Sequence, residues 1–134
     1  MRILAAYLGA AVVMAGLDLT WLRLSANALY HPQLGGLLAD KTNNIAAIAF
    51  YLVYVAGIVG LGVVPALRSS VPATALLNGA LLGFFAYATY DLTNLATLKG
   101  WPVGLSLIDM AWGTLLTAIS AGAGAFAANL VPAR

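Results

Sequence analysis

Four long apolar runs dominate the chain, and each is long enough to form a helix that crosses a bilayer. The runs cover residues 3–24, 44–64, 73–98 and 103–129. As a helix, the first run measures about 33 Å at a rise of ~1.5 Å per residue, and a bilayer core is about 30 Å thick. The pattern predicts an all-α fold, an integral membrane four-helix bundle in which residues 1–134 form a single transmembrane domain.

The connections between the runs are short, except for the segment over 25–43. Leu34, Leu37 and Leu38 recur there at helical spacing after Pro32, which predicts a short helix that lies at the membrane interface. Short loops make successive spans antiparallel, so both termini should lie on one side of the membrane. Lys and Arg residues divide equally between the two sides. We expect cytoplasmic termini, since Asp40 weakens the positive charge of the other side.

Composition agrees with a membrane location. The chain is 63% hydrophobic and 7% charged, whereas soluble domains carry about 25% charged residues. A cleaved signal peptide is the competing interpretation of the first run, but that run is long and contains Asp18. The net charge of +2 does not favour nucleic-acid binding. The chain has no cysteine, which excludes thiolate metal sites. Its one histidine cannot form a zinc or haem site unaided. The sequence identifies no cofactor.

Three acidic residues lie at one depth of the predicted bundle. Asp18 and Asp91 lie near the ends of the first and third runs, and Asp109 lies near the start of the fourth. In an antiparallel bundle these three helix ends emerge on one membrane face, so all three acids lie about 10 Å below it at the helical rise. A carboxylate inside a membrane is costly and is by default a candidate for function. Several carboxylates close together in a low dielectric cannot all stay ionised, so either protons or a cation must neutralise them. We therefore predict a site for a proton, a cation or a polar ligand.

Other polar side chains share this depth and extend the candidate site. Tyr87 and Asn94 fall on the same helical stripe as Asp91, and Tyr51 in the second run lies at a similar depth. Tyr30 and His31, in the long connection, are candidates for a lid over the site. The three tryptophans are predicted to be interfacial anchors. They are Trp21, Trp101 and Trp112.

Two local patterns bear on how the helices pack. Gly79 and Gly83 are spaced to let two helices approach closely. The segments DLTWL over 18–22 and DLTNL over 91–95 resemble two copies of one short motif. Their similarity suggests that the bundle consists of two tandem helical hairpins.

The sequence also resembles a known family. The resemblance is carried by the run YATYDLTNLATLKGWP over 87–102, by DMAWG over 109–113, by Asp18 with the residues over 21–22, and by FYL over 50–52. These segments are similar to a family of small bacterial inner-membrane proteins, the domain of unknown function 2177. The resemblance implies a four-helix protein of the inner (plasma) membrane with one domain, and it implies no reaction or substrate.

Three functions fit these observations. The first is a membrane protein that binds or transports a proton, a cation or a small polar or amphipathic ligand; because four helices are few for a transport path, a transporting form would be a homo-oligomer. The second is an enzyme that acts on lipid, with the acids as general acid and base. The third is an accessory subunit in which the acids only join the helices.

Overall fold

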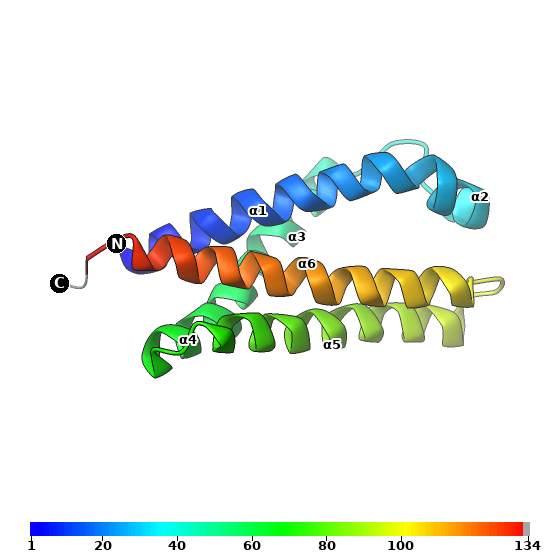
Figure 1. Ribbon diagram of the computed structural model, residues 1–134. Coiled ribbons are helices and arrows are strands. Elements are labelled where there is room, and N and C mark those ends of the chain that lie inside the picture. Colours follow the sequence, from blue (N-terminus) through cyan, green and yellow to red (C-terminus); the bar gives the residue numbers. More distant parts are fainter. Residues whose placement is uncertain (133–134) are drawn as a thin grey trace.

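The computed structural model describes residues 1–132, and every regular element in that range is helical. The chain forms four helical rods, so the predicted all-α fold is confirmed (Figure 1). The first rod is continuous from Arg2 to Leu37. It comprises α1 (Arg2–Ser25), the π-helical η1 (Ala26–Tyr30), α2 (His31–Leu34) and η2 (Gly35–Leu37).

The second rod runs from Asn44 to Ser69. It consists of α3 (Asn44–Gly57), the π-helical η3 (Ile58–Val63) and α4 (Val64–Ser69). The third and fourth rods are the single helices α5 (Ala73–Thr97) and α6 (Val103–Asn129).

The first two rods continue further than the apolar pattern predicts. The connection expected over 25–43 is helical as far as Leu37, so only residues 38–43 lie outside helices. Pro32 lies in the first turn of the short helix α2, as the sequence predicts, but α2 follows η1 without a break. Each of these rods contains a proline shortly after a π-helical segment. Pro32 follows η1 in the first rod, and Pro65 follows η3 in the second. Proline cannot donate to the carbonyl four residues back, and a wider π-helical turn changes that register locally. The helix therefore bends at these prolines instead of ending.

Three of the rods are long and apolar enough to cross a membrane. They are Arg2–Leu37, Asn44–Ser69 and Val103–Asn129. Helix α5 has 25 residues and would be about 37 Å long, but its polar residues lower its hydropathy. Helix α5 is therefore not among these three candidates, and the predicted span over 73–98 stays a prediction.

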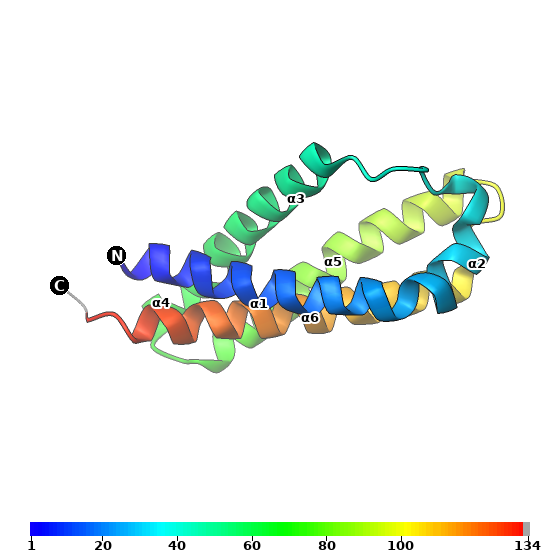
Figure 2. The same cartoon turned by 90° about the horizontal axis from the view of Figure 1, so that it is seen from above.

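Helix α6 is the central element of the bundle. Its most extensive contacts are with α5, followed by α1, and η3 packs against both α5 and α6. Helix α1 contacts α3 much less than it contacts α6. Figure 2 shows that α3 diverges from α1 toward the 38–43 connection, and Figure 1 shows that it also leaves the direction of α5. The two hairpins are thus unlike each other, since α5 and α6 pack closely along their length whereas α1 and α3 separate.

Glycines allow α5 and α6 to approach each other closely. A side chain at Gly83 would collide with the Gly113 carbonyl oxygen and with Thr117. A side chain at Gly113 would occupy the position of the Tyr87 ring. The expectation that Gly79 and Gly83 serve packing is confirmed, because both face the α6 backbone.

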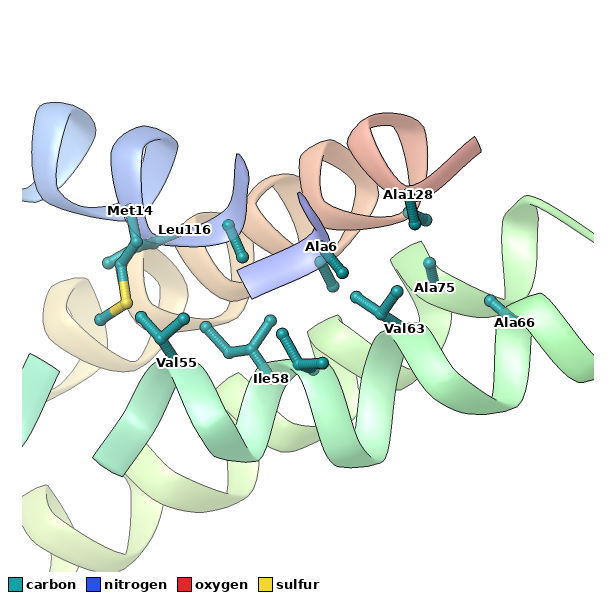
Figure 3. Packing of buried hydrophobic residues seen from close by; sticks show 13 residues of the cluster. Ala6, Met14, Val55, Ile58, Val63, Ala66, Ala75, Leu116 and Ala128 are labelled. Carbon is teal, nitrogen blue, oxygen red and sulfur yellow. The ribbon is translucent and has the colours of Figure 1, made fainter. Parts of the chain in front are cut away.

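The apolar core lies in the half of the bundle that contains the start of α1 and the end of α6. Its buried side chains include Met14, Ile58 and Leu116, surrounded by alanines and valines (Figure 3). At this end Arg2 donates hydrogen bonds to the Ala128 carbonyl, at 3.1 Å, and to Asn129, at 2.6 Å. The acidic residues of α1, α5 and α6 lie outside this core, toward the other end of the bundle.

Asn78 stabilises the bend in the second rod. Its side-chain amide donates a hydrogen bond of 3.1 Å to the Leu61 carbonyl. In a regular helix that carbonyl would accept from residue 65, but Pro65 has no N–H group. The α5 side chain therefore replaces the donor that the proline removes.

We predict that Asn78→Ala lowers the free energy of unfolding in detergent by about 1–3 kcal/mol, the cost of leaving a polar group without a partner. In a Pro65→Ala background the cost should be smaller, because the new N–H can serve the Leu61 carbonyl. Equal costs in the two backgrounds would show that Asn78 acts in some other way.

Candidate functional site

Three of the acidic residues lie on α6 and on the two helices that pack most extensively against it. Asp18 is on α1, Asp91 on α5 and Asp109 on α6. Asp91 is 0% exposed and Asp18 is 8% exposed, while Asp109 is half-buried. We refer to these three residues as the carboxylate cluster.

Asp18 has its hydrogen-bonding needs met by neighbouring side chains. The Tyr51 hydroxyl donates to Asp18 Oδ2 at 2.6 Å, and the Trp112 indole N–H donates to Oδ1 at 3.3 Å. These donors come from α3 and α6. Asp18 therefore joins three helices.

A second chain of hydrogen bonds leads to Asp109. The Trp21 indole N–H donates to the Tyr30 hydroxyl at 3.2 Å, and this hydroxyl donates to Asp109 Oδ1 at 2.7 Å. The rings of Trp21 and Trp112 stack with centroids 4.6 Å apart and planes 12° from parallel. The stacked indoles thus link the surroundings of Asp18 to those of Asp109.

The carboxyl group of Asp91 has different surroundings from those of Asp18 and Asp109. Both of its carboxyl oxygens are buried and lack a partner among the described residues. The nearest polar groups are those of Asp109, Trp101 and Ser106. Trp101 donates its N–H to Ser106 Oγ at 2.9 Å, and Ser106 donates its hydroxyl to the Pro102 carbonyl at 3.0 Å. The donors near Asp91 are therefore engaged elsewhere.

A cleft of about 340 Å³ opens beside Asp109, between α3 and α5. Its wall is largely aromatic, and Asp109 is the acidic residue in it. The lining residues are Phe50, Tyr54, Ala86, Tyr87, Tyr90 and Asp109.

The remaining candidates from the sequence take different places. Tyr87 lines the cleft, and Tyr51 reaches Asp18 instead of the cleft. Asn94 is half-buried on α5 and makes no hydrogen bond to Asp91. Tyr30, in the continuous first rod, donates a hydrogen bond to Asp109 of the cluster, whereas its neighbour His31 is exposed.

Sequence reasoning missed the part played by the tryptophans. Trp21 and Trp112, expected to be interfacial anchors, are half-buried and take part in the hydrogen bonding of the acids. The available signal was spacing, since each follows an aspartate, Asp18 or Asp109, by three residues and so shares its helix face. Phe50 and Tyr90 were also missed, because their place in the cleft depends on how α3 and α5 lie in space.

The hydrogen-bond donors to the cluster are all neutral. They are two tyrosine hydroxyls and one indole N–H, so no Lys or Arg side chain compensates the acids through a hydrogen bond. Among the described residues, no group of three or more His, Cys, Asp or Glu side chains is placed to hold one metal ion. The arrangement suits a proton or a cation bound by one or two carboxylates.

We predict that Tyr51→Phe lowers the free energy of unfolding by about 1–3 kcal/mol, because it removes the short hydrogen bond to a buried acid. Tyr7→Phe is the matched control. It removes a hydroxyl hydrogen bond of 3.0 Å to the Leu52 carbonyl, which its own helix already engages. A Tyr7→Phe cost as large as that of Tyr51→Phe in a detergent unfolding assay would contradict this assignment.

Comparison with known proteins identifies the family but no activity. A search of curated proteins gives no match, and neither does a search of solved structures. The family model described as "Predicted membrane protein (DUF2177)" matches residues 3–126. That match covers almost the whole chain and includes all three acids of the cluster, so the protein belongs to the DUF2177 family of predicted membrane proteins.

Proposed function

We propose that this membrane protein binds a proton or a cation at the carboxylate cluster. The observation that carries the proposal is Asp91, which is 0% exposed and whose two carboxyl oxygens have no hydrogen-bond partner in the described part of the chain. Burying an ionised carboxylate without a partner costs several kcal/mol or more. A neutralising occupant removes that cost.

The position of Asp109 beside Asp91 strengthens this argument. Two neighbouring carboxylates repel each other in a low dielectric, and one shared proton or one cation between them relieves the repulsion. The one hydrogen bond that Asp109 accepts comes from the neutral Tyr30 hydroxyl. The described residues therefore leave the negative charge of this pair uncompensated, and a bound proton or cation would compensate it.

A purely structural role accounts for Asp18 but not for Asp91. Asp18 accepts hydrogen bonds from α3 and α6 and behaves as an interhelical link. An acid that served only to join helices would be expected to accept hydrogen bonds in the same way. Among the described residues, Asp91 accepts no hydrogen bond from a side chain, although its side chain is less exposed to solvent than that of Asp18.

The geometry favours some occupants over others. A multidentate metal ion such as Ca²⁺ takes six to eight oxygen ligands, and the described residues offer no group of three acidic or imidazole ligands for one ion. A proton shared by Asp91 and Asp109, or a cation that needs one or two carboxylates, fits the site better.

We predict that the melting temperature of the wild-type protein in detergent rises as the concentration of the occupant rises, whether this is the proton or an added cation. Ligand that binds only the folded state at 100 times its Kd stabilises by about 2.7 kcal/mol. Asp91→Asn should abolish this response, because it removes the charge and keeps the size of the side chain.

Asp40→Asn is the matched control, since Asp40 is an exposed acid in the 38–43 connection. This variant should respond as the wild type does. If wild type and Asp91→Asn gave parallel profiles, with the variant uniformly weaker, the cluster would be only structural and the proposal would fail.

A further inference from the structure

The cleft beside Asp109 has walls of a distinctive kind. Phe50 and Tyr54 come from α3, and Tyr87 and Tyr90 come from α5, so aromatic rings stand on both sides. Asp109 on α6 is the one charged residue in its lining. At about 340 Å³ the cleft lies in the range of sites for small organic molecules. It is far larger than a bare inorganic ion requires.

The aromatic walls are held in place by specific contacts. The hydroxyls of Tyr54 and Thr117 form a hydrogen bond of 2.9 Å, and Phe50 stacks on Tyr54 with centroids 5.5 Å apart. The Tyr87 ring packs on Gly113 and meets Tyr54 edge to face at 6.5 Å. The cleft is thus a built feature of the α3, α5 and α6 arrangement.

Negative charge is concentrated at one side of this cleft. Asp109 accepts a hydrogen bond on Oδ1 from the neutral Tyr30 hydroxyl. Close to Asp109 lies Asp91, fully buried and without a partner. A ligand that brought a positive charge to Asp109 would also compensate the acid next to it.

We infer that the cleft binds an organic ammonium ion with an apolar body, its charged group at Asp109 and its body between the aromatic rings. This inference rests on the proposed function and names the class of cation. Carboxylates bind ammonium groups by charge-assisted hydrogen bonds, and aromatic faces attract cations while burying apolar groups. The same walls offer no second charge for an anionic or zwitterionic ligand.

The position of the cleft fits a ligand that dissolves in the bilayer. Its rim residues Phe50 and Tyr90 belong to α3 and α5 and are 44% and 56% exposed. On helices that cross a membrane, we expect apolar rings as exposed as these to face lipid. An amphipathic amine would therefore reach Asp109 between these two helices.

The test is a titration of the purified protein in detergent with phenethylamine, compared with phenethyl alcohol, its neutral analogue of similar size. We expect the amine to bind and to raise the melting temperature, and the alcohol to bind at least about tenfold more weakly, since a charge-assisted hydrogen bond is lost. Asp109→Asn should weaken amine binding by a similar factor and keep the acceptor for Tyr30. Asp40→Asn should leave amine binding unchanged.

A second variant addresses the aromatic wall independently. Phe50→Leu keeps an apolar side chain at a partly exposed position, so the fold should tolerate it. It should weaken amine binding about twofold to fivefold, the effect of losing a cation–π contact at an exposed site, and should affect the alcohol less.

The outcomes separate this inference from the proposed function. Equal binding of amine and alcohol, or amine binding that survives Asp109→Asn, would overturn the inference. If wild type showed an Asp91-dependent response to protons or to inorganic cations and none to phenethylamine, the proposed function would stand and the inference would fall. Absence of every response would overturn both.

Discussion

The close approach of α5 to α6 is the constraint on which the rest of the structure depends. Gly83 and Gly113 provide it, because neither position has room for a side chain. The same approach seats the Tyr87 ring on Gly113 and brings Asp91 beside Asp109. Without it the two acids would lie apart, and each could find its own partners. The packing contact and the unusual electrostatics of the site therefore have one cause.

The bundle divides its two tasks between its two halves. The half with the start of α1 and the end of α6 holds a core of alanine, valine and other apolar side chains around Met14 and Leu116. The other half contains the carboxylate cluster, the stacked indoles and the aromatic cleft. Divergence of α3 is what opens the cleft, and the Asn78 contact to Leu61 steadies the bent part of that rod. The apolar core that stabilises the bundle thus lies apart from the site, and Asp91 can be buried without a hydrogen-bond partner among the described residues.

Much of the fold could be predicted because it follows from apolar run length and helical periodicity. The shared depth of Asp18, Asp91 and Asp109 follows from counting residues along each run, and the close helix contact at Gly79 and Gly83 follows from their spacing. The continuation of the first rod through Pro32 could not be predicted, because it depends on a π-helical segment that no residue pattern marks. That segment ends at Tyr30, whose hydroxyl reaches Asp109. The divergence of α3 and the stacking of Trp21 on Trp112 were equally hidden, since both depend on how separate helices meet in space.

The central claim is that the buried pair of Asp91 and Asp109 is neutralised by a proton or a bound cation. Infrared spectroscopy of the protein in lipid vesicles, with ¹³C-labelled aspartate, tests it directly, because the chain contains only four acidic residues. We expect a band from a protonated carboxylic acid that responds to pH or to added cation and is missing from Asp91→Asn. Carboxylate bands alone, unchanged by pH and by every cation added, would contradict the claim.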